Sequence, residues 1–126
     1  MLTTRDGTPT GLLLVLRRLS PGPELDHVLL LTEALSATDT PVVVAAEESG
    51  LAHEVARRGA QFIALPLESK ARKVRTNAGH IVKLLRERNL GLMHAHDELS
   101  LDAAAAAVEK SGVPLLITAH RPLAAA

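Results

Sequence analysis

Two stretches, Asn89-Leu-Gly-Leu-Met-His-Ala-His-Asp97 and Val113-Pro-Leu-Leu-Ile-Thr-Ala-His-Arg121, decide the fold of this chain. Each begins with a short apolar run, which is typical of a strand buried on both faces of a parallel sheet, and each ends in a polar motif that contains histidine. Ligands of an open α/β sheet bind beyond the carboxyl ends of the strands. The two motifs therefore predict one shared site at that edge of the sheet.

Apolar runs and helical patterns alternate along the rest of the chain. We expect five strands, over residues 12–16, 42–46, 62–65, 90–94 and 115–119. Apolar positions at helical spacing predict four helices between them, over residues 25–35, 51–58, 69–85 and 97–108. This alternation predicts a Rossmann-like α/β domain, a doubly wound parallel sheet of about five strands with helices on both faces. Right-handed crossovers favour the strand order 3-2-1-4-5, counted along the chain.

Small polar residues mark the expected helix ends. Ser49 and Ser69 are the expected N-caps of the second and third helices, and either Asp97 or Ser100 is the expected N-cap of the fourth. Gly112 should end the fourth helix.

The composition bounds the class of protein. A length of 126 residues indicates one domain, and 47% of the residues are hydrophobic. The formal net charge is zero and Phe62 is the only aromatic residue, which disfavours nucleic acid as a partner. The sequence has no cysteine and no apolar run long enough to span a bilayer. We therefore expect a cytoplasmic protein. Because the chain stops just after the second motif, we also expect that it is one domain of a longer protein.

The histidine motifs are compatible with more than one role. His94 and His96 share one face of their strand because they are two residues apart. We expect His94 to pack against a helix and to make a hydrogen bond. His96 should point out of the strand end, where an imidazole can donate to phosphate or accept a proton from a hydroxyl. His120 follows a buried strand beside Arg121, and the alternative for this pair is an exposed, frayed terminus.

Two other chemistries are disfavoured. A metal site at His94 and His96 would need a third ligand, such as Asp97 or His120, and no other spacing in the sequence resembles a ligand set, so we expect no metal. A triad of Ser100, His96 and Asp97 lacks the glycines of a nucleophile elbow, and its Ser and Asp suit helix caps.

A basic segment opens the third expected helix. Half of the 14 Lys and Arg residues lie between Lys70 and Arg88, with Glu87 as the only acid among them. Lys70, Arg72 and Lys73 are expected in the first turn, where each cation opposes the macrodipole by roughly 0.3–1 kcal/mol. With Arg75 they form a candidate anion-binding patch for phosphate, an anionic acceptor or an anionic membrane surface. The alternative is a solvated helix face.

The first loop holds Gly22 between two prolines. A glycine here permits a tight turn or the close approach of a ligand. Without a G-x-G-x-x-G fingerprint, the loop argues against a dinucleotide site, and no cofactor is expected.

The run from Leu90 to His96, the alanine-rich helix after it, and the run from Gly112 to His120 together resemble the N-terminal domain of GT-B glycosyltransferases. The nearest match is the family-4 group of retaining enzymes, whose first helix and third-strand segment resemble residues 24–35 and 58–67. The resemblance implies a two-domain enzyme that moves a hexose from a nucleotide-sugar donor to an acceptor. This domain would bind mainly the acceptor. A C-terminal domain with a pair of glutamates, absent from this chain, would hold the nucleotide.

The resemblance also implies roles for individual residues. His120 would lie near the transferred sugar and its phosphates and His96 near the acceptor entrance, so these two are the catalytic candidates. The candidate substrate-binding residues are Gly22, Glu24, Asp97 and Arg121. The chain departs from the family in having prolines around Gly22, where a Gly-Gly pair is usual, and Arg121, where a small residue is common.

The sequence therefore predicts the acceptor-side half of a glycosyltransferase, inactive alone because half of the catalytic cleft is missing. Its expected partners are a nucleotide-sugar donor, an acceptor that the sequence does not identify, and the anionic inner face of a membrane, with no nucleic acid. The alternative is a non-catalytic Rossmann-like binding or interaction module, which the altered first loop and Arg121 would favour.

Overall fold

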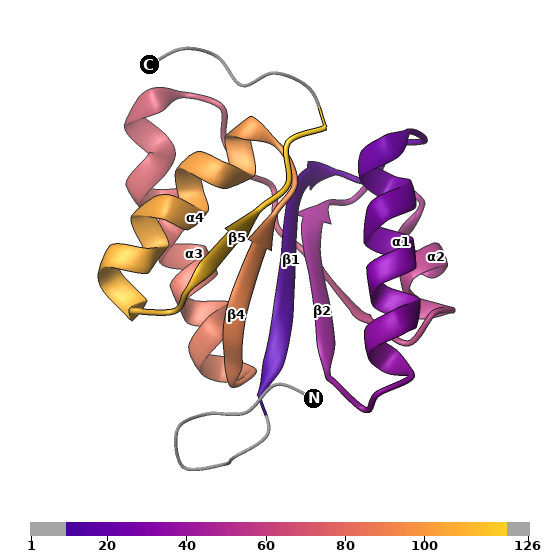
Figure 1. Cartoon of the computed structure of the whole chain (residues 1–126). Helices are drawn as coiled ribbons and strands as arrows, with labels where there is room; N and C mark the ends of the chain where they lie inside the picture. Colours follow the sequence, from indigo (N-terminus) through magenta and orange to yellow (C-terminus); the bar gives the residue numbers. More distant parts are fainter. Residues whose placement is uncertain (1–9, 121–126) are drawn as a thin grey trace.

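The structure is a computed structural model that describes residues 10–120. Its strands are β1 (Gly11–Arg18), β2 (Val42–Glu47), β3 (Gln61–Ala64), β4 (Leu90–Ala95) and β5 (Leu115–Ile117). Its helices are α1 (Pro23–Ser36), α2 (Ala52–Ala56), the 3-10 turn η1 (Ala71–Lys73), α3 (Val74–Glu87) and α4 (Glu98–Ser111). The strands pair in parallel in the order β3-β2-β1-β4-β5, as the sequence predicts (Figure 1).

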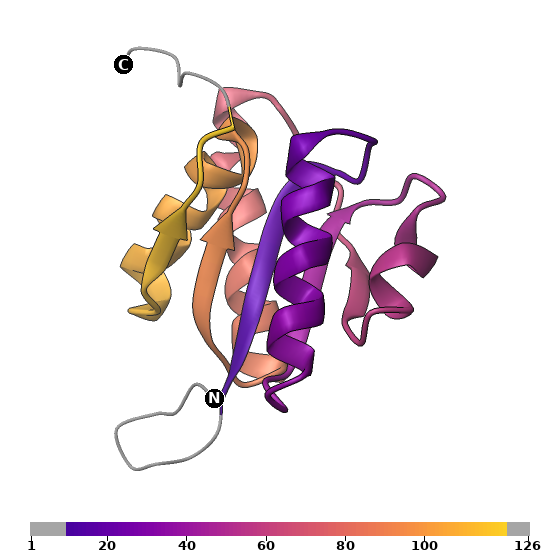
Figure 2. The same ribbon diagram turned by 45° about the vertical axis from the view of Figure 1, so that its right-hand side comes forward.

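The central strand β1 has a core on each side of it. Leu13 and Val15 belong to the core under α3 and α4, whereas Leu12, Leu14 and Leu16 belong to the core under α1 and α2. Figures 1 and 2 show these helix pairs on opposite faces of the sheet. Because side chains alternate along a strand, an unbroken apolar run supplies both cores at once. The expectation of a doubly wound sheet is confirmed.

The ends of α4 also form as expected. Asp97 is the N-cap and makes a capping box with Ser100, in which the Ser100 backbone N–H donates to Asp97 Oδ1 at 2.9 Å. Gly112 ends the helix in the left-handed conformation, with a φ of 71°. Asp97 thus fixes the direction in which the chain leaves β4.

The predicted caps at Ser49 and Ser69 are wrong. The Ser49 hydroxyl is bonded elsewhere, and another side chain holds the backbone before Ser69. The Ser49 hydroxyl donates to the Leu19 carbonyl at 2.6 Å, and α2 begins after Leu51 without a side-chain cap. Ser69 does not cap α3. The buried Asn77 side chain bonds both backbone groups of Glu68, so the chain reaches η1 before the helix begins at Val74.

The basic segment is therefore placed differently from the prediction. Lys70 precedes η1, Arg72 and Lys73 lie in it, and only Arg75 lies in the first turn of α3. Lys73 Nζ is 3.8 Å from a Glu68 carboxylate oxygen. Lys73 is the N-cap residue of α3, so of the four cations only Arg75 lies within the first turn, and Arg72 and Lys73 lie directly before it.

Among residues 10–120, no helix combines the length and the apolar character that crossing a bilayer requires. Two strands end elsewhere than predicted: β1 continues to Arg18 rather than ending at residue 16, and β5 ends at Ile117 rather than at residue 119. Thr118 and His120 consequently lie beyond the sheet.

Candidate functional site

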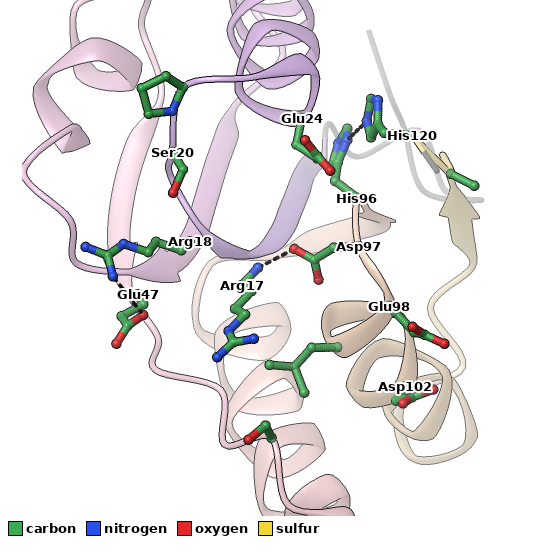
Figure 3. A pocket seen from close by; sticks show the side chains of 14 residues that line it. Arg17, Arg18, Ser20, Glu24, Glu47, His96, Asp97, Glu98, Asp102 and His120 are labelled. Carbon is green, nitrogen blue, oxygen red and sulfur yellow. Dashed lines mark hydrogen bonds and ion pairs between the residues drawn. The ribbon is translucent and has the colours of Figure 1, made fainter. Parts of the chain in front are cut away.

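A pocket of about 760 Å³ lies beyond the carboxyl ends of the central strands (Figure 3). Its walls come from the end of β1, the loop before α1, the turn between β4 and α4, and the segment after β5. The chain turns from the β2–β3 side of β1 to the β4–β5 side at this place, which is where open α/β sheets bind ligands. The polar residues that line it include Arg17, Arg18, Ser20, Glu24, Glu47, Ser69, His96, Asp97, Glu98, Asp102 and His120.

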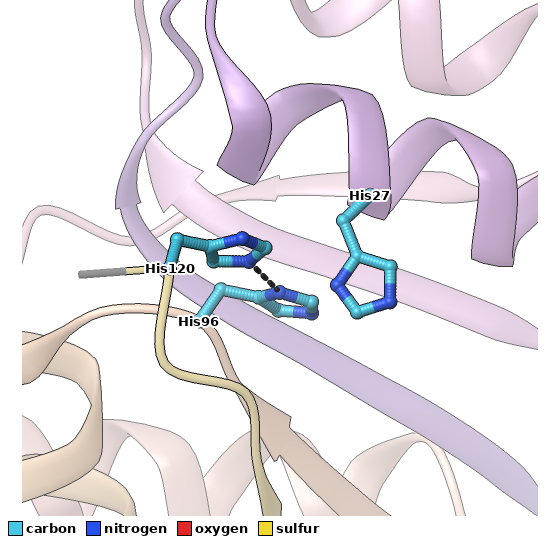
Figure 4. A group of neighbouring side chains, drawn as sticks. All are labelled: His27, His96 and His120. Atoms are coloured by element: carbon cyan, nitrogen blue, oxygen red, sulfur yellow. Dashed lines mark hydrogen bonds between the residues drawn. The ribbon is translucent and has the colours of Figure 1, made fainter.

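Two histidines that are 24 residues apart in sequence meet at this pocket. His96 Nδ1 and His120 Nε2 are 3.4 Å apart, a contact in which the donor depends on the tautomer (Figure 4). The backbone N–H of His96 donates to the Val15 carbonyl at 3.1 Å, and that of Thr118 donates to the Ala95 carbonyl at 3.1 Å. Sheet-like backbone pairing therefore holds both motifs at neighbouring strand ends.

A third histidine, His27 of α1, completes the group. Its ring lies edge-on to His96, with the centroids 5.1 Å apart, and edge-on to His120, with the centroids 5.3 Å apart. His94 stacks on His96 at 4.1 Å between centroids, and its Nε2 lies 2.7 Å from the Thr118 hydroxyl. The His94 ring also lies edge-on to His27 of α1, with the centroids 5.7 Å apart, so the expectation that His94 packs against a helix and makes a hydrogen bond is confirmed.

Burial makes these imidazoles poor bases. Burial lowers the pKa of His96 to about 3, with further lowering by the neighbouring histidines, and lowers the pKa of His94 to about 4. The pKa of His27 is also lowered, first by burial and then by His120. At neutral pH these rings are uncharged, so they interact with a ligand through hydrogen bonds or lone pairs.

The structure corrects the expected exposure of His96. The side chain does not project from the strand end: it is 1% exposed, because the rings of His27 and His94 pack against it. It still lines the pocket, and its Nε2 has no hydrogen-bond partner. His96 therefore contacts the site from its floor.

The other predicted site residues are only partly brought together. Glu24 and Asp97 line the pocket (Figure 3). The Asp97 carboxylate is engaged by the backbone N–H groups of Arg17 and Ser100. Gly22 is not among the lining residues: it is the N-cap of α1, with a φ of 150° that favours glycine. Arg121 lies outside the described residues.

The four residues of the basic segment do not line this pocket. Lys70, Arg72 and Arg75 are exposed and Lys73 is partly buried. Ser69, directly before them, does line the pocket, so the segment borders it.

The structure bears differently on the two disfavoured chemistries, the serine triad and the metal site. The Ser100 hydroxyl is buried and donates to the Asp97 backbone carbonyl at 3.1 Å, so it acts in the helix cap and is not a free nucleophile. His27, His96 and His120 each offer a ligand atom within 4.8 Å of the others. The potential third ligand beside His96 and His120 is therefore His27 and not Asp97 or His94.

Sequence reasoning missed His27, Arg17 and Arg18. A signal existed for each of them. His27 lies one turn into the first helix and the two arginines end the first strand, and both places border the crevice of a doubly wound sheet.

Comparisons with known proteins bear on this site. Residues 26–125 match the family described as Glycosyltransferase Family 4. No curated protein is significantly similar in sequence to the chain.

Solved structures share the fold. A glycosyltransferase from Rickettsia africae ESF-5 superposes with a TM-score of 0.72 at 12% identity, over 86% of this chain and 29% of that one. MurG from Acinetobacter baumannii superposes with a TM-score of 0.71 at 11% identity, over 93% and 37%. A universal stress protein from Archaeoglobus fulgidus superposes less well, with a TM-score of 0.51 at 15% identity, but over 89% of this chain and 96% of its own. The chain thus spans about a third of the first two proteins and nearly all of the third.

Proposed function

Because the chain belongs to Glycosyltransferase Family 4, we propose that it is the acceptor-side, N-terminal domain of an enzyme that moves a hexose from a nucleotide-sugar donor to an acceptor. In this proposal the donor nucleotide is bound by a C-terminal domain outside this chain, and the chain alone does not catalyse transfer. The family match and the short span relative to the two larger structures support this assignment.

The contact between His96 and His120 at the pocket is the observation that carries the proposal. During transfer the bond between sugar C1 and the phosphate oxygen breaks, a bond forms from C1 to the acceptor hydroxyl oxygen, and the proton of that hydroxyl passes to the leaving phosphate. The departing nucleoside diphosphate gains negative charge. His120 would donate a hydrogen bond to that charge, and a donor of this kind contributes roughly 10²- to 10³-fold to a rate.

His96 would position the acceptor rather than carry charge. Its ring is buried and its pKa is lowered to about 3, so it is neutral and can accept a hydrogen bond from an acceptor hydroxyl. This gives the two histidines different tasks: His96 orients the nucleophile and His120 stabilises the leaving group.

The charges around the pocket favour a polar acceptor. Arg17, Arg18 and the carboxylates of Glu47, Glu98 and Asp102 all line the pocket, with Arg18 beside Glu47 (Figure 3). Arg18 is itself paired with Glu47 at 4.0 Å. A mixed wall of this kind suits a hydroxyl-rich molecule, whose groups both donate and accept hydrogen bonds.

The first turn of α1 borders the pocket at the same place. Glu24 lines the pocket, and Gly22 allows the sharp entry into the helix. Backbone N–H groups at a helix N-terminus bind phosphate oxygens, so this turn is the proposed contact for the donor's phosphates.

The basic segment of Lys70, Arg72, Lys73 and Arg75 is the proposed contact with an anionic membrane surface. The segment borders the pocket through Ser69, so membrane attachment would bring a lipid-linked acceptor to the site. Each basic residue near an anionic surface contributes about 1 kcal/mol of attraction.

A second candidate is a non-catalytic binding module with this fold. The superposition on a universal stress protein shows that this fold also occurs outside glycosyltransferases. The downstream reading frame separates the two: a second α/β domain with spaced glutamates supports the transferase, and a native stop codon after residue 126 supports the module.

The direct test is His120→Ala in the full-length protein, with transfer of labelled sugar as the readout. We expect transfer to fall by about 10²-fold or more while circular dichroism shows an intact fold. His80→Ala, on the exposed face of α3, is the matched control and should leave transfer unchanged. Near-normal turnover in His120→Ala would show that His120 does not contribute to transfer.

A further inference from the structure

Four of the six histidines of the chain form one cluster. His27 comes from α1, His94 and His96 from the end of β4, and His120 from the segment after β5. Two ring nitrogens in the cluster, His27 Nδ1 and His96 Nε2, are buried and have no hydrogen-bond partner. A buried polar atom without a partner is destabilising, and a ligand at His27 Nδ1 would relieve that cost, whereas His96 faces His120 through its other nitrogen, Nδ1.

We propose that His27, His96 and His120 form a binding site for a divalent transition-metal ion of the zinc type. One ring nitrogen from each of the three residues lies within 4.8 Å of the others (Figure 4). His96 Nδ1 and His120 Nε2 are already 3.4 Å apart. Ligand nitrogens at about 2.0–2.1 Å from a tetrahedral zinc are separated by about 3.4 Å, so the group must contract from its present spread of up to 4.8 Å to hold an ion.

The donor set selects the class of metal. Three imidazoles without a thiolate suit Zn²⁺, Ni²⁺, Cu²⁺ or Co²⁺, whereas Mg²⁺ and Ca²⁺ prefer oxygen ligands. Three histidines around one ion also leave a fourth position open, as in catalytic zinc sites.

The surroundings hold the ligands in place. His96 is 1% exposed, its backbone is bonded to Val15, and its ring is stacked on His94. The Thr118 hydroxyl anchors His94 in turn at 2.7 Å. His94, itself held by Thr118, thus limits the rotation of the His96 ring by stacking on it.

The open position faces the pocket. His96 and His120 both line it, and Figure 3 shows the Glu24 carboxylate beside them. A bound ion would present its fourth position to a water molecule or to an anionic oxygen of a pocket ligand. The ligands are complete within this chain, so the test of the site does not depend on sugar transfer, although an ion bound to His96 and His120 would occupy ring nitrogens that the proposed transfer also uses.

The test measures metal binding to the tag-free chain after treatment with EDTA. We expect one equivalent of Zn²⁺ to bind, to raise the melting temperature by several degrees, and to compete with Co²⁺, whose visible absorption should indicate tetrahedral coordination by nitrogen. His27→Gln, His96→Gln and His120→Gln should each weaken zinc affinity by more than the roughly 10- to 100-fold typical of losing an outer partner.

The control is the double variant His53→Gln/His80→Gln, which removes the two exposed histidines outside the cluster. It should bind zinc with unchanged affinity. His120 lies beyond the sheet, so the His120→Gln variant tests the site even if the variants at buried positions fail to fold. Absence of zinc binding at micromolar concentration, or binding lost in the control and retained in His120→Gln, would overturn the proposal.

Discussion

The Asp97 carboxylate accepts a hydrogen bond from the backbone N–H of Arg17 at 2.6 Å, across 80 residues of sequence. Its other oxygen accepts from the backbone N–H of Ser100 at 2.9 Å. One side chain thus joins the end of the central strand to the start of α4. Both elements border the pocket, so this carboxylate sets the distance between two of its walls.

Asp97→Ala should therefore destabilise the fold by about 1–3 kcal/mol, through the loss of a helix cap and of a charge-assisted hydrogen bond. Urea denaturation measures the change. Asp102→Ala removes an exposed carboxylate from the same helix and serves as the control, with an expected change within about 0.5 kcal/mol. Equal stability of the two variants would contradict this role for Asp97.

Two glycines should respond to alanine in opposite directions. Gly22 has a φ of 150°, and a Cβ there would meet only Glu24 Oε2 at 3.8 Å, so the backbone conformation and not space forbids a side chain. We expect Gly22→Ala to cost about 1–3 kcal/mol. Gly79 lies within α3, and no atom lies within 4 Å of a Cβ built there, so Gly79→Ala should stabilise the fold by about 0.5–1 kcal/mol. Thermal melts of both variants test this pair, and a stable Gly22→Ala protein would show that the turn can rearrange.

Stability of the metal-free chain should fall between pH 7 and pH 5. An unfolded histidine titrates near pH 6.5, whereas the folded-state pKa is about 4 for His94 and about 3 for His96. Between these values the unfolded chain binds more protons than the folded chain, so acidification favours unfolding. The expected loss at pH 5 is on the order of 1–2 kcal/mol per histidine.

Urea titrations in EDTA at pH 7, 6 and 5 measure that loss. His94→Gln should flatten the pH dependence, and His53→Gln, which replaces an exposed residue, should leave it as it is. A free energy of unfolding that does not change between pH 7 and pH 5 would mean that these rings are protonated in the folded state as readily as in water.

Replacing Lys70, Arg72 and Lys73 together by Gln should abolish most sedimentation with anionic vesicles. The loss of three cations near the surface corresponds to about 3 kcal/mol, or roughly 10²-fold in binding. The matched control replaces three exposed cations that lie after these residues in the chain, Lys83, Arg86 and Lys110. Sedimentation that does not depend on anionic lipid would contradict the proposed membrane contact.

The repeated pattern of apolar runs made the fold predictable. Strand order, the two layers of helices and the Asp97 cap follow from local features: the alternation of elements, the unbroken apolar strands and a small acidic residue before a helix. The Ser49 and Ser69 caps failed because distant partners, the Leu19 carbonyl and the Asn77 side chain, outweighed local preference.

The sequence by itself determined that His96 and His120 would come from neighbouring strand ends, because parallel strands end at one edge. Only the tertiary structure decided that His96 is buried and neutral, and that His27 completes the group, since α1 reaches the cluster by packing across the sheet. Local periodicity fixes which face of a helix is apolar. The contact between a polar residue near the end of a helix and a distant loop depends on how the helices pack against the sheet. The spacing of residues along the chain does not determine the distance between those two groups.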